Sequence, residues 1–191
     1  MKKSTIVLIV IIAVVLLLFG WFFGTRNSLV SLSEDVQMQQ AQIETTLQRR
    51  SDLIPNLVAT VQGYVDHEEA VFTEIAEARS ALAGSIETGD LEAMNEANNN
   101  LDSALGRLLA ISEAYPDLKA SEQFTRLQDE LAGTENRIAV ARQYYNESVQ
   151  KYNRKVQSFP SSIVANMSGY STRNYFEADE DAKDAPSVSF K

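Results

Sequence analysis

The chain has 191 residues, a formal net charge of −9 at pH 7 and no cysteine. This charge argues against a nucleic-acid partner and against a domain that lies flat on anionic lipid, because both need a basic field. The lack of cysteine excludes thiolate catalysis, zinc ribbons and disulfides, and it fits either redox compartment.

The first predicted element is a membrane anchor over residues 1–24. Residues 6–23 are eighteen consecutive uncharged residues, nearly all of them apolar. At about 1.5 Å per residue, this run with Thr5 and Gly24 forms a helix roughly 30 Å long, which matches the hydrocarbon thickness of a bilayer. A cleaved signal peptide is the alternative. Its apolar region is shorter, about 7 to 15 residues, and ends in small residues, whereas this run ends in the bulky sequence GWFFG.

The flanking charges predict how this single-pass anchor is oriented in the cell (inner) membrane. Lys2 and Lys3 precede the span, and Arg26 follows it closely. The positive-inside bias therefore favours a cytoplasmic N-terminus and an extracytoplasmic domain, by a margin of one charge plus the terminal amine.

Residues 25–160 are predicted to form an elongated antiparallel helical bundle, so the expected fold class is all-α. Apolar residues recur at intervals of three and four between residues 29 and 82 and again between residues 124 and 159, which is typical of packed helices. The second pattern predicts a helix of about 36 residues, roughly 54 Å long, that begins after Ser121 and ends before Pro160. The first segment is its only candidate partner of matching length.

Three interruptions are predicted within this bundle. Pro55 costs about 3 kcal/mol inside a helix, so a kink or short break is expected over residues 52–56. Gly84 and the polar residues 85–90 predict a helix stop and a turn. Pro116 ends the helix that follows. That helix is apolar on one side, and its other face is predicted to carry Asn95, Asn98, Asn99 and Asn100.

Two further segments follow Pro160. Residues 161–176 hold enough apolar side chains to pack back on the bundle. Residues 177–191 are acidic and rich in small residues, which predicts a disordered tail.

The densest group of polar residues spans residues 48–58. Arg50 falls on the apolar stripe, and a buried arginine must be paired, for which the other long helix offers Glu130, Glu135 and Asn136. One interpretation is a binding groove at the proline kink, and the other is an internal ion pair that fixes the helix register. The candidate binding residues of this segment are Arg49, Arg50, Asp52, Pro55 and Asn56.

A second group lies on the long C-terminal helix, where a Tyr-Asn pair repeats after seven residues. The spacing places both tyrosines on one face of the helix. One interpretation is a polar ladder that specifies a partner or an oligomeric state, as a single buried Asn can in a coiled coil. The other is a pair of core tyrosines with hydroxyls at the rim. The candidate binding residues on this helix are Glu135, Asn136, Arg137, Tyr145, Asn146, Tyr152 and Asn153.

The sequence contains no recognisable catalytic or metal motif. The single histidine, His67, has no partner at metal-binding spacing, and it is expected on a solvated helix face. Phosphate loops and nucleophile elbows are also absent from the sequence. We therefore predict a protein that is not an enzyme, with no catalytic residue, no metal, no cofactor and no small-molecule substrate.

Several blocks taken together resemble the bacterial LemA family. After the N-terminal span, they are LQRRSDLIPNLV (47–58), GYVDHE (63–68), YPDLK (115–119), TENRIAVAR (134–142) and the two Tyr-Asn pairs that lead to FP (159–160). The resemblance implies a membrane-anchored antiparallel helical bundle of unestablished molecular function, without catalytic residues. It also implies a small external N-terminus, which conflicts with the charge count, so both orientations stay open.

The expected function is a non-enzymatic membrane scaffold that self-associates or docks another membrane protein. Confinement to a membrane raises the effective concentration of partners, so weak contacts suffice. The alternative is an envelope sensor or adaptor whose bundle changes conformation at the Pro55 kink.

Overall fold

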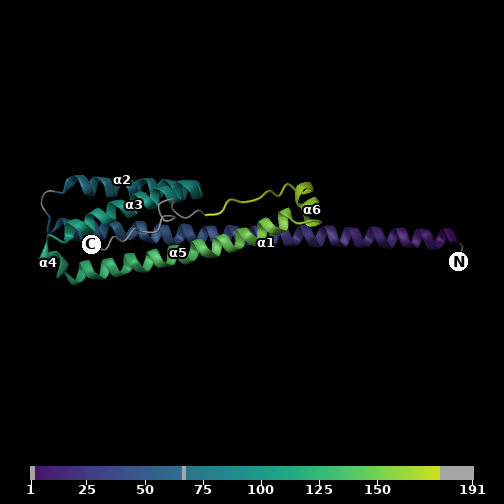
Figure 1. The fold of residues 1–191 in the computed structure, drawn as a ribbon, viewed down its shortest axis with the longest axis horizontal. Helices are drawn as coiled ribbons and strands as arrows, with labels where there is room; N and C mark the ends of the chain where they lie inside the picture. Colours follow the sequence, from purple (N-terminus) through teal and green to yellow (C-terminus); the bar gives the residue numbers. More distant parts are fainter. Residues whose placement is uncertain (1–2, 66–67, 177–191) are drawn as a thin grey trace, which may run out of the picture. The chain divides into compact units, whose positions relative to one another are not determined.

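The computed structural model describes residues 3–65 and 68–176, and this part of the chain is all-α without strands, as predicted. Two compact units divide the chain: unit 1 comprises Met1–Gln39 and Tyr144–Tyr175, and unit 2 comprises Gln40–Gln143 and Phe176–Lys191. The predicted tail and His67 lie outside the described residues. The helices (Figure 1) are α1 (Lys3–Gln62), α2 (Glu69–Thr88), α3 (Leu91–Ser112), α4 (Pro116–Lys119), α5 (Glu122–Gln157) and α6 (Ser161–Met167).

The N-terminal part of α1 is apolar and uncovered. Its large apolar side chains from Ile6 to Phe19 are 44–73% exposed. Within the described part of the chain, α1 is the helix long and apolar enough to cross a membrane. This stretch therefore makes no core with the rest of the protein.

The helix α1 continues through Pro55, so of the predicted kink or short break over residues 52–56 the break does not occur. Proline has no N–H to donate to the carbonyl four residues earlier, which belongs to Ser51. Arg79 of α2 supplies the missing donor, since its Nε lies 3.0 Å from the Ser51 carbonyl oxygen. Ser51 is only 1% exposed, so this bond satisfies an acceptor that water cannot reach.

The chain turns after α1 instead, at residues 63–64, and the first apolar stripe is shared between α1 and α2. The stripe itself is confirmed, because Leu47, Leu57 and Leu82 are all fully buried. Two helices rather than one therefore carry the stripe that the sequence predicted for a single long segment.

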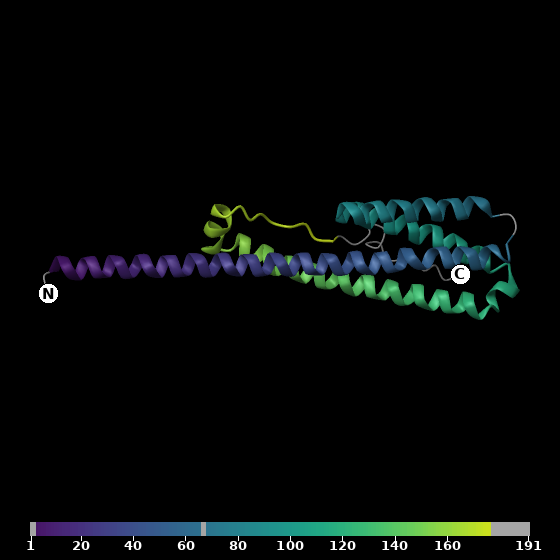
Figure 2. The same ribbon diagram turned by 180° about the vertical axis from the view of Figure 1, so that it is seen from behind.

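The turn between α2 and α3 lies within the predicted residues 85–90, but the helix stop lies later than Gly84. Gly84 is inside α2, and the helix ends at Thr88 with Gly89 as its cap, whose φ of 68° is the left-handed conformation that glycine adopts without strain. Asp90 then caps α3, because its side chain accepts from the backbone N–H groups of Glu92 and Ala93. The two helices lie side by side in Figure 1 and in the reverse view of Figure 2.

Unit 1 consists of the first part of α1, the last part of α5, helix α6, the turn at residues 168–169 and the segment 170–175. The helix α5 ends at Gln157, before Pro160 as predicted. Figure 2 shows the segment after α6 leading away from this short helix as an extended chain. The core of unit 1 is formed by buried side chains of both long helices and of α6, including Leu29, Val36, Tyr145, Val149, Tyr152 and Val164.

Candidate functional site

The most connected polar group in unit 2 is the Arg50 cluster, formed by Arg50, Asn98, Asp102 and Glu135. Arg50 is 4% exposed. Its Nη1 donates to Asn98 Oδ1 at 2.7 Å and to Glu135 Oε2 at 2.6 Å, and its Nη2 pairs with Asp102. The amide of Asn98 donates to Asp102 at 2.9 Å. The predicted burial of Arg50 is confirmed, and of its three predicted partners, Glu130, Glu135 and Asn136, it is Glu135 that pairs with it.

The cluster joins α1, α3 and α5, and its arrangement favours the interpretation as an internal ion pair. Two carboxylates face one guanidinium, and the side chains of Asp102 and Glu135 are 41% and 44% exposed. The acidic ends therefore reach the rim of the bundle, while the positive charge stays inside. Such a pair fixes how the helices align, because each of its members comes from a different helix or turn.

The burial of Asn98 contradicts the prediction that it lies on the helix face opposite the apolar side. Asn98 is fully buried. It lies four residues after Met94 and three before Leu101, both of which are also buried. Its position thus continues the three-and-four spacing of the apolar stripe, and this spacing was the signal that could have indicated it.

The predicted groove residues around Pro55 do not form one site. Arg49, Asp52 and Pro55 are exposed, and Asp52 accepts a hydrogen bond at 2.9 Å from Gln48, one turn earlier on the same helix. Of this segment only Asn56 borders a hollow, described next. Further along the chain, the candidates Asn136 and Arg137 on α5 are also exposed.

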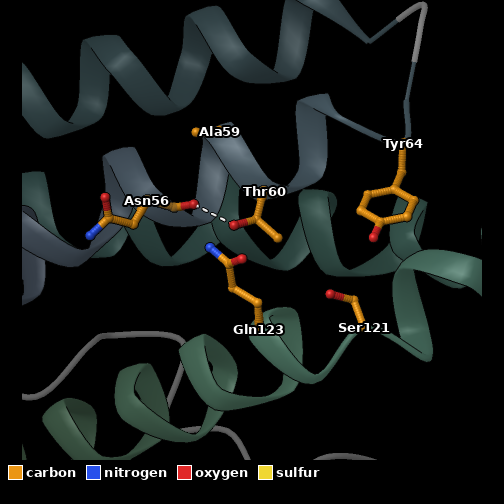
Figure 3. A pocket seen from close by; sticks show the side chains of 6 residues that line it. All are labelled: Asn56, Ala59, Thr60, Tyr64, Ser121 and Gln123. Atoms are coloured by element: carbon orange, nitrogen blue, oxygen red, sulfur yellow. Dashed lines mark hydrogen bonds between the residues drawn. The ribbon is translucent and has the colours of Figure 1, made fainter.

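A shallow polar hollow of about 270 Å³ lies between the end of α1 and the start of α5 (Figure 3). Thr60 donates to the backbone carbonyl of Asn56 at 2.8 Å, so this hydroxyl is already engaged. The hollow offers amide and hydroxyl groups and no charged side chain. Its lining residues are Asn56, Ala59, Thr60, Tyr64, Ser121 and Gln123.

The Tyr-Asn pairs in unit 1 bind a segment of the protein itself, the strap formed by residues 171–174. The hydroxyl of Tyr145 donates to the Asn174 carbonyl at 3.1 Å, and that of Tyr152 donates to the Ser171 carbonyl at 2.8 Å. Tyr145 and Tyr152 are each 2% exposed, which agrees with the interpretation as core tyrosines whose hydroxyls reach outward.

Asn153 fixes the middle of the strap with two bonds. Its amide donates to the Arg173 carbonyl, and its side-chain oxygen accepts from the Arg173 N–H, both at 2.8 Å. This pairing imitates one rung of a β-ladder and sets the register of an extended segment on a helix. Asn146, the partner of Tyr145 in the sequence repeat, is half-buried on the same helix.

Burial also shifts the pKa of Tyr145, which holds the strap. Desolvation raises the pKa of Tyr145 above its ordinary value of 10.0, and the positive charge of Arg173 lowers it by a smaller amount. Tyr145 therefore stays protonated at physiological pH and keeps the hydrogen that it donates to Asn174.

The structure thus brings the candidate residues together in two places, the Arg50 cluster in unit 2 and the strap contacts in unit 1. The strap is not predictable from the sequence, because its acceptors are backbone carbonyls, which every residue carries. The roles of Asp102 and Arg79 were not predicted either. Over residues 3–65 and 68–176, no group of three His, Asp or Glu side chains is arranged to hold a metal ion.

The chain is similar to several known proteins. MamQ 2, a magnetosome protein of Paramagnetospirillum magneticum, is 27% identical, with 85% of this chain and 68% of the relative covered. The magnetosome protein MamQ of Magnetospirillum gryphiswaldense is 26% identical with the same coverage. The protein LemA of Metamycoplasma hominis is 27% identical, with 75% of this chain and 65% of the relative covered. The model of the LemA family matches residues 39–190, most of the sequence, and the chain therefore belongs to the LemA family.

Proposed function

We propose that this protein is a membrane-anchored, non-enzymatic scaffold whose helical part makes contacts at a membrane surface. One observation carries the proposal: the apolar stretch and the first core positions of unit 1 belong to the same unbroken helix. The side chains from Ile6 to Phe19 are exposed, whereas Leu29 and Val36 on that helix are fully buried. Lipid is the environment that removes such an apolar stretch from water.

The continuous helix explains how an anchor places the packed part of the chain. A helix has no free joint between its turns, so the residues after Gly24 are held next to the membrane that takes up residues 6–23. Partners confined to the same membrane meet at a raised effective concentration. We therefore expect contacts with a second copy of the chain or with another membrane protein.

The proposed contact surface uses the exposed candidate residues, while the buried ones hold the fold. Arg49, Asp52 and Asn56 recur on α1 at intervals of three and four, so they share one face of that helix. Asn136 and Arg137 are exposed on α5. The absence of any reaction from the relatives' names supports a contact role over a catalytic one.

Crosslinking in cells tests the scaffold. A photo-crosslinking residue replaces Arg49, Asn56 or Arg137 in separate full-length proteins, and Glu77, which is exposed on α2, is the matched control position. We expect a discrete crosslinked product from at least one of the three positions and none from the control. A protein that is monomeric by native mass spectrometry after detergent extraction, and that gives no crosslinked neighbour, contradicts the proposal.

The sensor alternative placed its moving part at Pro55. The helix α1 is unbroken there, and Arg79 takes up the carbonyl that proline frees. A conformational switch requires two arrangements of similar free energy. Since the contact with Arg79 stabilises one arrangement, we favour the scaffold.

A further inference from the structure

The corner between α5 and α6 in unit 1 exposes large apolar side chains. Phe159 is 83% exposed, Met167 is 73% exposed and Ile163 is 48% exposed. Ile163 and Met167 are four residues apart on α6 and share one face, while Val164 and Ala165 on the same helix are fully buried. The short helix therefore has apolar groups on its outward side as well as its inward side, which is unfavourable in water.

This corner lies level with the end of the apolar stretch of α1. A hollow of about 470 Å³ in unit 1 is lined by Trp21 and Thr25 from α1 and by residues 158–161 from the corner. Thr5 to Gly24 form a helix of roughly 30 Å, the thickness of the hydrocarbon core, so a membrane surface lies close to Gly24. Trp21 then sits in the interfacial zone, where tryptophan is enriched.

The same hollow is basic, although the chain as a whole is acidic. Lys151, Arg154 and Lys155 line it, and no acidic side chain is among the described residues that do so. The net charge of −9 disfavours contact between anionic lipid and the chain as a whole, but the side chains of this corner are positively charged. Basic groups beside apolar ones are the combination that binds an anionic bilayer surface.

We propose that this corner, formed by Lys151, Arg154, Lys155, Phe159, Ile163 and Met167, inserts into the headgroup layer and binds an anionic phospholipid. The basic side chains and the hydroxyl of Ser158 hold the phosphate, and the three apolar side chains contact the upper part of the acyl chains. The proposal rests on the proposed membrane anchor. It adds a second point of attachment, which fixes unit 1 against rotation about the axis of α1.

Site-specific labelling tests the insertion, because the chain has no cysteine of its own and only one tryptophan. The full-length Phe159→Cys protein carries a nitroxide and is placed in nanodiscs with anionic and zwitterionic phospholipids. Tyr144→Cys is the matched control, since Tyr144 is 52% exposed on α5 in the same unit. We expect the label at position 159 to collide with oxygen dissolved in lipid and to lose contact with a water-soluble nickel reagent. At position 144 the label stays open to nickel.

Trp21 separates failure of the corner from failure of the anchor. Its fluorescence is quenched by brominated acyl chains if the span is in the bilayer. If Trp21 is quenched while labels at 159, 163 and 167 all remain open to nickel, the corner proposal is wrong and the anchor stands. Labels that are shielded from both oxygen and nickel indicate a protein partner, and this result also overturns the proposal that the corner binds lipid. If Trp21 is not quenched, the anchor fails, and the corner proposal fails with it.

The charge requirement is tested with two triple variants of equal net charge. Lys151→Gln, Arg154→Gln and Lys155→Gln remove the basic groups of the corner, and Arg107→Gln, Lys119→Gln and Arg126→Gln remove three from unit 2. Retention of phosphatidylglycerol in native mass spectrometry is the readout. We expect roughly a fivefold loss of apparent affinity for each corner charge removed, and no change in the control. Equal retention by both variants contradicts the proposal.

Discussion

The contact between Arg79 and Ser51 is the residue-scale feature that lets α1 continue through Pro55. Leaving a buried carbonyl without a donor costs about 1–3 kcal/mol. The sequence shows the proline and its penalty, but it cannot show that a side chain 24 positions further on compensates for it. Single residues of this kind decide whether a local rule holds in a particular fold.

A double-mutant cycle tests this compensation. Arg79→Met should lower the free energy of unfolding by about 1–3 kcal/mol, because the Ser51 carbonyl loses its donor. In a Pro55→Ala background the same change should cost less, since residue 55 then donates its own N–H to that carbonyl. Chemical denaturation of the four proteins gives the coupling. Equal costs in both backgrounds are the outcome that excludes the contact as the reason for the unbroken helix.

Arg49 and Arg50 are adjacent in the sequence, and substituting each in turn tests whether the buried arginine stabilises the fold. Arg50→Met should destabilise the fold by about 3 kcal/mol, because Asp102, Glu135 and buried Asn98 lose their shared partner. The half-exposed carboxylates limit the cost. Arg49→Met, one residue earlier and exposed, should change stability by no more than about 0.5 kcal/mol. Similar denaturation midpoints for both variants would falsify the assignment of Arg50 to an internal ion pair that stabilises the fold.

Tyr145 makes the stability of unit 1 depend on alkaline pH. Its folded-state pKa is raised above 10.0 by burial, so the folded state keeps this proton longer than the unfolded state does. The stabilisation is complete below pH 10 and is lost as pH rises through the folded-state pKa. Tyr145→Phe should therefore flatten the fall in unfolding free energy as the pH rises above 10. Tyr144 is an exposed neighbour, so Tyr144→Phe should leave the pH dependence of the unfolding free energy as it is in the unsubstituted protein.

At the scale of helices and connecting segments, the spacing of apolar residues predicted which helix faces are buried. The preferences of single glycine and proline residues predicted helix ends at the wrong positions. Leu47, Leu57 and Ile138 lie in the core because the spacing of apolar residues reports burial directly. Gly84 was expected to stop a helix, but Gly89 does so, since of these two glycines only Gly89 adopts the left-handed conformation. Two glycines five residues apart cannot be ranked without knowing where α3 must begin.

The strap could not be predicted for a different reason. Its recognition by Tyr145, Tyr152 and Asn153 depends on where an extended segment returns, and its acceptors are backbone carbonyls. The repeat of Tyr-Asn pairs was visible in the sequence. Its partner was not, because any extended segment presents the same groups.

Hydrogen exchange tests how the strap is held. Asn153→Ala removes both bonds to Arg173, so the Arg173 N–H should exchange with solvent at least tenfold faster, as expected for a loss of about 1.4 kcal/mol of local stability. Gln150→Ala, at an exposed position of the same helix, is the control. If exchange at Arg173 is unchanged by the first variant, Asn153 does not hold the strap.

At the scale of the whole molecule, the distribution of charge matters more than its sum. The acidic excess keeps most of the surface away from anionic lipid, while basic residues line the hollow beside the end of the apolar stretch. The family match begins at residue 39, so the identity of the protein rests on its packed part, and the anchor rests on physical argument alone.

The orientation of the chain follows from a small charge difference and can be measured. The positive-inside bias favours an extracytoplasmic packed part, so a single cysteine at Ser103, an exposed position of α3, should react with a membrane-impermeant maleimide in intact cells. Reaction only after permeabilisation indicates the opposite orientation. Because Lys2 and Lys3 supply the bias, replacing both with Gln should produce a mixture of labelled and protected protein. If the cysteine at position 103 is protected in intact cells while Lys2 and Lys3 are both present, something other than the flanking charges orients the span.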